Sequence, residues 1–584
     1  MKIKHLFGLA VIAAMTASCS SNEDLGTAGP GTGTNEAGVG YAIFTINLPS
    51  VSGTRAADAG GAEMNEGTEE EYAVKSATAL IFQKYGSDEG SYKFVESVTL
   101  PIDGWKDDPT DGITTTSKKL VAKLTNVDTK NDYSVLILLN NNKTGGGAKV
   151  ELPTAGQSYN DWNSKILTPS VTDLAASGDF YMANAPLKGS AASPATLVPI
   201  DKNKIYASEA EANKPTNDCA ATVFVERGVA KMTVAAHGTI TVKDKATTKL
   251  TKSQVTFSNW ALDITNKKTF AVHNIDGLSS DFSTIWNTDP SNRFIGTNNR
   301  VYWGKDPNYD KKELKLTDEA VAKRKDEFNF ITATSEINKD FTNTTNTNPV
   351  YCLENTFNLA NMYQGQTTRV IFKATYTPKD DTGNPLADKD GTFYTIGNMK
   401  TILNTDKLKP AVDAVANPVL PTGYTIDYTN FKTEGSHVIT LTDIKDSTGK
   451  TLVGDTDYSG KTGTEIVKEI NDKLGLKAGR PEEMVGINTY RRGVTYYIAR
   501  VKHFGSLTPW NSGESYGTDN GKYLGRYGML RNNWYDLTVG NVYGPGYPGV
   551  PPVDPTQPDD ENEKYLSVSV KILSWAKRSD IVDL

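Results

Sequence analysis

The sequence contains very little cysteine and histidine for its length. Its 584 residues include three cysteines and five histidines. Two thiols besides Cys19 could pair in an oxidising compartment, but they cannot form the disulfide framework of a small secreted domain. We expect Cys219 and Cys352 to be buried and unpaired. The histidines are widely separated and show no HExxH or paired spacing, so the sequence offers no pattern of metal ligands.

Motifs that mark enzymes and ion sites are missing as well. There is no GxSxG nucleophile elbow, and the Gly-Lys-Thr within Gly454–Gly463 lacks the spacing of a phosphate-binding loop. The acidic stretches "DDPTDG" and "DKDGTFY" lack the full EF-hand pattern and are typical of turns. We therefore expect no enzymatic activity, no catalytic residues, no cofactor and no bound metal.

Strong charge and long hydrophobic runs are also absent. The net charge is −7, so no basic field attracts nucleic acid. No apolar run beyond the N-terminus is long enough to cross a membrane. Serine, threonine, asparagine and glycine are abundant and helical apolar periodicity is scarce, which favours a β-rich exported protein.

The N-terminus has the pattern of an export signal. Lys2 and Lys4 precede the ten-residue apolar segment Leu6–Met15, which is too short to span a bilayer. The segment ends in "TASC", a run of small residues that closes on Cys19 and resembles a bacterial lipobox, with threonine in place of the usual leucine. We expect removal of residues 1–18, lipidation of Cys19 and an outer-membrane lipoprotein precursor. An ordinary signal peptidase site is the alternative.

The rest of the chain is a succession of short strand patterns separated by turn residues. Runs such as "VKSATALIFQKYG" and "DYSVLILLNNN" predict strands, and "TGTEIVKEINDKLGL" predicts one helix, capped by Thr464 and ended by Gly475. We expect an all-β fold with small helical insertions, made of two antiparallel β-sandwich domains in tandem. The expected divisions are a signal peptide at 1–18, a propeptide with tether and first strand at 19–55, an N-terminal domain at 56–226, a C-terminal domain at 227–541, and an unstructured Pro/Gly linker with a last strand at 542–584.

Two strand patterns at opposite ends of the chain share one alternation of apolar and polar residues. When "YAIFTINL" from Tyr41 and "YLSVSVKI" from Tyr565 are aligned, only Ile43 against Ser567 breaks the correspondence. Each segment is expected to bury one face, so both could fill the same groove, although any edge strand shows such alternation. The matched apolar residues are Ala42, Phe44, Ile46 and Leu48 in the first segment and Leu566, Val568, Val570 and Ile572 in the second.

Arginine is almost absent from the first part of the chain. Arg55 is the only arginine before Arg227, and it stands in a small-residue linker just after the first strand pattern. Cleavage between Arg55 and Ala56 would release that strand and leave a groove that recruits a strand from another chain. The C-terminal segment, with Trp575 adding apolar area, is the expected recruit. Such a tail-to-groove contact is heterologous and grows a filament. Chance in a lysine-preferring protein is the alternative explanation of Arg55.

Several segments together resemble the fimbrillins of Bacteroidales type V pili. They are the lipobox, the first strand, the Arg-Ala site, "VERGVAKM", "YYIARVKHF" and "YGMLRNNWYDLTV". Their order most resembles the main shaft subunit of the short (minor) fimbriae of Porphyromonas. The resemblance implies a transthyretin-like Greek-key topology and a structural subunit that supports adhesion and biofilm formation.

The resemblance also implies how the subunit is processed and assembled. Cys19 would carry the lipid, an arginine-specific, gingipain-like protease would cut the bond between Arg55 and Ala56, and residues 565–584 would be donated to the next subunit. The partners would be identical subunits arranged head-to-tail in extracellular fimbriae, accessory tip and anchor pilins, and host or bacterial surface receptors. A tip or anchor pilin, and a non-polymerising surface lipoprotein that binds glycans, remain alternatives.

Overall fold

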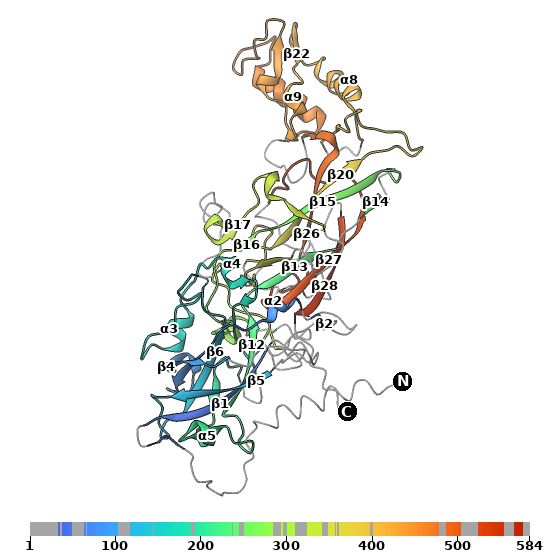
Figure 1. The fold of residues 1–584 in the computed structure, drawn as a ribbon. Coiled ribbons are helices and arrows are strands. Elements are labelled where there is room, and N and C mark those ends of the chain that lie inside the picture. Colours follow the sequence, from blue (N-terminus) through green and yellow to red (C-terminus); the bar gives the residue numbers. More distant parts are fainter. Residues whose placement is uncertain are drawn as a thin grey trace.

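The structure is a computed structural model of the chain, and Figure 1 shows it as a ribbon. In 64–65 and 566–575 it describes the backbone only. The described residues are 33–35, 38–48, 64–65, 67–102, 117–143, 145–188, 193–235, 238–243, 250–283, 286, 294–295, 301–309, 324–341, 349–356, 358, 361–397, 401–477, 486–503, 524–553 and 566–575.

The N-terminal domain is built on one nine-stranded sheet. Its order is β11-β1-β12-β9-β6-β3-β4, with β5 paired to β1 and β10 paired to β6. Every residue of β6 is buried, as its continuous apolar sequence predicts for a strand covered on both faces. The strands are β1 (Gly40–Asn47), β3 (Ala77–Gln83), β4 (Lys93–Leu100), β5 (Ser117–Leu124), β6 (Tyr133–Leu139), β9 (Met182–Asn184), β10 (Val198–Ile200), β11 (Ile205–Tyr206) and β12 (Ala221–Arg227).

The C-terminal domain packs two five-stranded sheets around one core. One sheet has the order β19-β13-β27-β28-β2, and the other has the order β14-β15-β20-β26 with β18 paired to β15. Met232 and Leu537 of the first sheet share the core with Val255 and Phe372 of the second. The strands are β2 (Met64–Asn65), β13 (Ala230–Val234), β14 (Thr239–Thr241), β15 (Gln254–Asp263), β18 (Lys339–Asp340), β19 (Val350–Cys352), β20 (Arg369–Thr377), β26 (Val494–Arg500), β27 (Asn533–Val542) and β28 (Leu566–Trp575).

An insertion between β20 and β26 forms a third unit with its own core. It lies at the end of the molecule opposite β1, with the C-terminal domain between them (Figure 1). Thr462, not Thr464, caps α9, because its side chain accepts the backbone N–H of Glu465, while Gly475 ends the helix in a left-handed conformation as expected. The elements are β21 (Phe393–Ile396), β22 (Tyr424–Ile426), β23 (Gly435–His437), β24 (Ile444–Asp446), β25 (Ile487–Tyr490), α8 (Thr405–Ala416) and α9 (Gly463–Leu474).

The remaining described elements are short. The helices are α2 (Glu69–Tyr72), α3 (Tyr159–Asn163), α4 (Val171–Leu174), α5 (Glu209–Ala212) and α6 (Leu278–Asp281). The minor strands are β7 (Ala175–Ala176), β8 (Asp179–Phe180), β16 (Thr265–Asn266) and β17 (Phe328–Asn329). Single 3-10 turns are η2 (Glu89–Ser91), η3 (Lys202–Lys204), η4 (Thr334–Glu336), η6 (Asn430–Lys432), η7 (Leu441–Asp443) and η9 (Arg491–Gly493).

The sheets are mixed rather than purely antiparallel, which corrects one part of the expected fold. β1 runs parallel to β12, and β13 runs parallel to β27. In each case the first long strand of a domain pairs with a strand from the end of that domain. In each domain, the sheet therefore joins strands from the beginning and the end of that domain's sequence. Local sequence patterns do not reveal this arrangement.

Cys219 and Cys352 are both buried, as expected. Cys352 is a free, buried thiol, and burial raises its pKa to about 12. Cys219 is also buried, and its sulfur lies 3.3 Å from the hydroxyl of Thr222. Because Cys352 is free, the two do not pair with each other.

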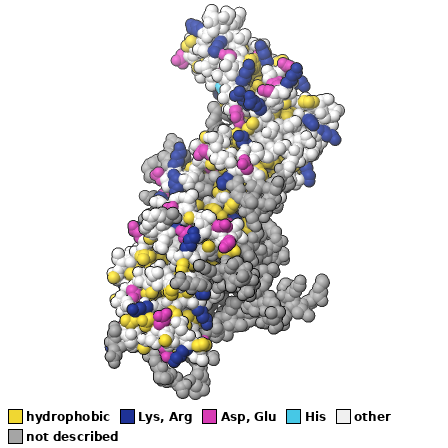
Figure 2. All heavy atoms as spheres, in the orientation of Figure 1, with side chains coloured by type: hydrophobic (Ala, Val, Ile, Leu, Met, Phe, Trp, Pro, Cys, Tyr) yellow, Lys and Arg dark blue, Asp and Glu magenta, His cyan; other side chains and the backbone are white. Residues whose placement is uncertain are grey.

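The surface of the described residues carries both signs of charge. Figure 2 shows Lys and Arg side chains intermixed with Asp and Glu side chains over the visible face. Among the described residues, no helix is both long enough and apolar enough to cross a membrane.

Candidate assembly site

The first strand lies inside the N-terminal sheet, with partners on both of its edges. On one edge β1 pairs antiparallel with β5 along its whole length. On the other edge it pairs parallel with β12 over Phe44–Asn47 and antiparallel with β11 at Tyr41 and Ala42. Its backbone is therefore hydrogen-bonded as that of an inner strand.

The side chains of this strand fill the core of the N-terminal domain. Ala42, Phe44 and Ile46 are 0% exposed, and Leu48, just beyond the strand, is 2% exposed. All four belong to the main core of the domain. Burial of Phe44, Ile46 and Leu48 together contributes about 5 to 9 kcal/mol.

The opposite face of β1 is also partly covered, in contrast to the expectation that the segment buries one face only. Ile43 is 6% exposed and packs in a small cluster with Tyr206, Ala212 and Cys219. These residues come from β11, from α5 and from the chain just before β12. The alternation within β1 could not reveal this cover, because it is supplied by residues more than 150 positions away.

Removing β1 would leave a slot between two ordered strands. β5 and β12 would face each other across one vacant strand position, and both would have unpaired backbone groups along that slot. Unpaired strand edges are templates for another strand, and an inner slot offers two such edges at once. The slot would also expose the pockets that hold Phe44, Ile46 and Leu48.

The C-terminal segment forms β28 and pairs antiparallel with β27 of its own chain. Its apolar positions stand opposite residues of β27 that are at most 1% exposed. The register therefore sets each matched position of β28 opposite a core position of β27. The opposed pairs are Leu566 with Val542, Val568 with Val539, Val570 with Leu537 and Ile572 with Tyr535.

The second edge of β28 has little strand cover. Among the described residues its only partner there is β2, in parallel pairs of Met64 with Ser574 and Asn65 with Trp575. The rest of that edge, Leu566–Leu573, has no strand partner among the described residues. In its own sheet β28 is thus paired along its length on one edge only, whereas β1 is paired on both edges.

The linker between β27 and β28 begins as a strap fixed to the C-terminal domain. The backbones of Tyr547 and Tyr496 form two hydrogen bonds, with N···O distances of 2.6 and 2.9 Å. The hydroxyls of Tyr490 and Tyr497 donate to linker carbonyls, each at 2.9 Å, the first to Gly546 and the second to Gly544. The prediction of a linker without fixed structure is therefore wrong for this part.

A buried arginine holds the end of the strap. Arg369 is 2% exposed and forms an ion pair with Asp263 at 2.8 Å. Its remaining guanidinium donors reach the carbonyls of Pro551 at 2.7 Å and Pro552 at 3.1 Å. Prolines keep their carbonyl acceptors, and the planar fork of arginine suits two neighbouring acceptors.

The junction of the two domains contains a buried ionic cluster around Glu71. The carboxylate pairs with Lys231 at 2.7 Å and accepts the hydroxyl of Tyr351 at 2.5 Å. Burial alone would raise the pKa of Glu71, but the Lys231 ammonium and these hydrogen bonds outweigh it and lower the pKa. The Lys231 ammonium also lies 3.7 Å from the ring centre of Trp534, a cation–π contact.

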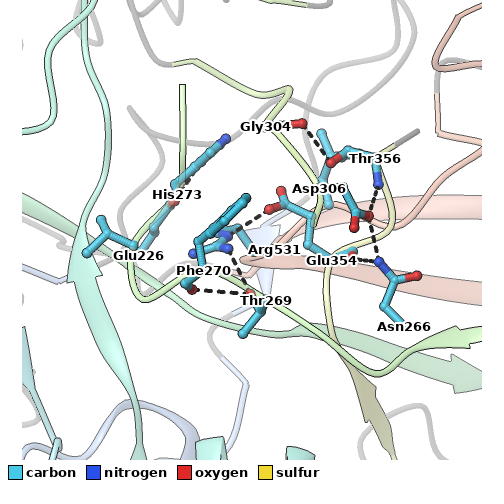
Figure 3. Close-up of polar contacts among 12 residues, drawn as sticks. Glu226, Asn266, Thr269, Phe270, His273, Gly304, Asp306, Glu354, Thr356 and Arg531 are labelled. Carbon is cyan, nitrogen blue, oxygen red and sulfur yellow. Dashed lines mark hydrogen bonds and ion pairs between the residues drawn. The ribbon is translucent and has the colours of Figure 1, made fainter. Parts of the chain in front are cut away.

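A second polar network ties the last strand of the N-terminal domain to the C-terminal domain (Figure 3). Glu226 of β12 lies 2.8 Å from Nδ1 of His273. Arg531 pairs with Glu354 at 3.0 Å. Asp306 is buried and accepts from Asn266 at 2.6 Å, and burial raises the pKa of Asp306 to about 7.

Several residues predicted from the sequence lie outside the described part of the chain. They are Cys19, Arg55, Ala56 and Tyr565, together with residues 576–584. The first arginine after Arg55 is described, and it is fully buried. Arg227 is 0% exposed and donates to the carbonyl of Glu71 at 2.8 Å and to Asn532 at 3.2 Å.

The strap and the ionic junction were missed by the sequence analysis. The strap donors Tyr490, Tyr497 and Arg369 lie far from the linker in sequence and belong to ordinary strand patterns. A signal existed in "GPGYPG", because alternating glycine and proline allow a chain to lie close against another backbone. A Cβ on Gly546 would lie 2.1 Å from the carbonyl oxygen of Tyr496, so only glycine fits there.

Comparison with known proteins gives one family match, in the region of the candidate assembly site. Residues 488–580 match the family described as major fimbrial subunit protein type IV, fimbrillin, C-terminal. This region runs from β25 through β26 and β27 to β28 and includes the strap. No curated protein matches the chain.

Solved structures give only remote similarity. A proposed cell adhesion protein from Parabacteroides distasonis is 11% identical, with 92% of this chain and 97% of that chain covered and a TM-score of 0.35. A fimbrial assembly protein from the same species is 12% identical, with 59% and 89% covered and a TM-score of 0.27. The C-terminally truncated tip fimbrial protein Mfa3 from Porphyromonas gingivalis is 8% identical, with 92% and 100% covered and a TM-score of 0.27. No inference rests on these similarities.

The family match agrees with the resemblance that the sequence motifs suggested, in the part of the chain where those motifs are densest. It covers the strand opposite β28, the strap and β28 itself. Residues 488–580 of this chain are similar to a fimbrillin C-terminal region.

Proposed function

We propose that this protein is the structural shaft subunit of a surface fimbria. The precursor is lipidated at Cys19 and reaches the outer membrane, and an arginine-specific protease cuts it between Arg55 and Ala56. Mature subunits polymerise head-to-tail in extracellular fimbriae by donation of the C-terminal strand, and the fimbriae support adhesion and biofilm formation. Each sandwich is expected to have the transthyretin-like Greek-key topology.

The observation that carries this proposal is the difference between β1 and β28. Both have the same alternation, but β1 has a strand on each edge, whereas β28 has one full ladder and a two-residue contact with β2. After β1 has left, the tail can move from its own β27 into a neighbour's slot. It then loses the hydrogen bonds to one strand and gains hydrogen bonds to two strands. It also refills the apolar pockets of β1.

The strap sets where the donated segment leaves its own domain. The chain is fixed as far as Pro552, and residues 554–565 separate the described strap from β28. Twelve extended residues span at most about 40 Å. The tail can therefore reach a neighbouring subunit while the strap stays in place.

The buried state of Arg227 supports cleavage at a single site in the N-terminal domain. A protease needs an accessible, extended segment, and Arg227 lies within β12 with its guanidinium bonded to buried acceptors. Between Arg55 and Arg227 the chain contains no other arginine. An arginine-specific protease can thus remove the first strand without cutting the domain that receives the tail.

Deletion of residues 565–584 tests the proposal. The truncated subunit should be exported and processed, and its slot should still accept a tail from a wild-type subunit. Because it has no tail to donate, it should end growing chains when it is mixed with wild type. Denaturant-resistant ladders on gels and electron microscopy should show shorter fibres as its proportion rises. Fibres of unchanged length, with the truncated subunit distributed along them, would refute strand donation by the tail.

A tip or anchor pilin remains the second candidate. A tip needs no donated tail, yet this chain has a C-terminal strand within its fimbrillin region. An anchor would keep its lipid and its first strand. N-terminal sequencing of the cell-surface form separates these roles, because a shaft subunit should begin at Ala56.

A further inference from the structure

A cavity of about 240 Å³ lies where the N-terminal and C-terminal domains meet. The N-terminal domain contributes residues of η2, of α3 and of the chain before β10, and the C-terminal domain contributes the start of α6 and Trp286. Clefts between domains are frequent ligand sites. This cavity lies apart from the slot of β1 and from the tail, so it does not take part in the proposed strand exchange.

The charged groups of the cavity are all acidic. Asp88, Glu89 and Asp276 line it, and none of its lining residues is a lysine or an arginine. The Glu89 carboxylate is held in place by the backbone N–H groups of Thr196 and Leu197, at 2.9 to 3.1 Å. Burial raises the pKa of Glu89 to about 7. An anionic ligand is disfavoured by this lining.

Uncharged polar groups lie beside the carboxylates. The Thr196 hydroxyl is buried and lines the cavity beside the Glu89 carboxylate and the Tyr159 hydroxyl. A hydroxyl can rotate to donate to a bound ligand or to accept from it. Asn160 lines the cavity from an exposed position and brings an amide that can both donate and accept.

An aromatic ring completes the lining. Trp286 is half-buried, and its ring centre lies 5.1 Å from that of Phe294, which supports it from behind. A tryptophan beside carboxylate, amide and hydroxyl groups offers a flat apolar surface next to many hydrogen-bonding groups. The volume is below the range of about 300 to 1,000 Å³ of pockets for drug-sized ligands, so one ring fits the space better than a larger molecule.

We propose that this cavity binds one neutral pyranose residue of a glycan. The sugar hydroxyls donate to Asp88, Glu89 and Asp276 and accept from Asn160 and Thr196, while one face of the ring packs on Trp286. No group of three His, Cys, Asp or Glu side chains among the described residues could hold a metal ion, so the carboxylates are not arranged as a cation cage. The site would let the fimbria recognise surface glycans, and it does not depend on polymerisation.

Saturation-transfer NMR on the purified full chain tests this inference. The probes are the methyl glycosides of galactose, glucose, mannose and N-acetylglucosamine, with N-acetylneuraminic acid as an anionic probe and cadaverine as an amine probe. At least one neutral glycoside should bind. Asp276→Asn and Asn160→Ala should each weaken that binding about tenfold or more, the loss expected for one hydrogen-bonding group.

Asp281→Asn is the matched control. It removes an exposed carboxylate from α6 without changing a residue that lines the cavity, so binding should stay unchanged. All substituted positions are exposed, and thermal unfolding should be the same for the four proteins. Lack of binding by every neutral glycoside, equal binding by all variants, or binding of cadaverine alone would each overturn the inference.

Discussion

Arginine is rare in the first part of the chain, and the proposed cleavage depends on that rarity. Arg55 and Arg227 are the first two arginines of the chain, and Arg227 is the one that the structure describes. Arg227 is fully buried, and burial lowers its pKa to about 10. Its guanidinium is nevertheless bonded to a carbonyl and an amide. This arginine stabilises the domain junction and is not available for cleavage in the folded protein.

Arg55→Ala should therefore leave the first strand attached to the N-terminal domain when an arginine-specific protease acts on the precursor. We expect unassembled subunits that retain residues 20–55, because β1 still occupies its slot. Arg55→Lys is the matched control for charge, and it should block the same protease while keeping the positive side chain. Mass spectrometry of surface protein and electron microscopy measure the two effects. Normal fibres formed by uncut Arg55→Ala protein would contradict the account.

The apolar positions of the tail should matter much more than the polar ones. Val568→Asp with Val570→Asp would place carboxylates in the pockets of the slot, where an unpaired buried charge costs several kcal/mol. We expect folded monomers and no denaturant-resistant ladder. Ser567→Ala with Ser569→Ala changes the opposite face without adding a charge, because Ser567 takes the position of the covered Ile43, and this variant should assemble. Equal ladders from both double variants would mean that the tail does not fill the slot.

At the residue scale, the sequence predicted which side chains of a strand share a face. It did not predict which residues from distant parts of the chain cover the opposite face. The alternation identified Ala42, Phe44 and Ile46 as residues that share a face, and the structure buries all three. It did not reveal that Ile43 is covered, since the covering residues come from β11 and α5. Helix capping was misplaced by two residues for a simpler reason, because Thr462 and Thr464 both precede the apolar stripe of α9.

At the scale of elements, the linker is the part where composition misled most. Glycine and proline in 543–553 predict a chain without fixed structure, but this segment is hydrogen-bonded to β25 and β26. Composition indicates which backbone conformations a segment can adopt. It does not indicate which hydrogen-bond donors from distant parts of the chain will bind the segment. The parallel pairs of β1 with β12 and β13 with β27 were missed for the same reason.

Loosening the strap should change local opening without changing the fold. Tyr490→Phe with Tyr497→Phe removes two hydrogen bonds to the linker, a loss of about 1 to 3 kcal/mol in total. Hydrogen–deuterium exchange of residues 543–552 should become faster. Tyr428→Phe is the control, because its hydroxyl bonds to Asp413 within the insertion, and exchange in the strap should be unchanged. Slow exchange in the double variant would mean that the strap is held by other contacts.

At the scale of the whole molecule, the N-terminal and C-terminal domains share core and charge. The core of the N-terminal domain includes Val272, Leu353 and Trp534, which belong to the C-terminal part of the chain. The ionic cluster of Glu71 and the network of Figure 3 lie at the same junction. Removing one partner of a buried ion pair is costly, so separating the two domains at this junction would be unfavourable.

The central claim is that β28 leaves its own sheet and takes the place of β1 in a neighbour, and disulfide trapping tests it most directly. With Tyr565 set where Tyr41 lies, Ser569 takes the place of Thr45, which is opposite Lys119 of β5. In its own sheet Ser569 is opposite Thr538 of β27. These two neighbours distinguish the exchanged tail from the self-paired tail.

Two cysteine pairs, in a background with Cys219→Ala and Cys352→Ala, report the two states. We predict that Ser569→Cys with Lys119→Cys gives a reducible ladder between subunits, and only after the first strand has been cleaved off. Ser569→Cys with Thr538→Cys should form a bond within one chain before cleavage and block assembly until it is reduced. Assembled fibres in which the second pair is closed within each chain, and the first pair never forms, would contradict strand donation.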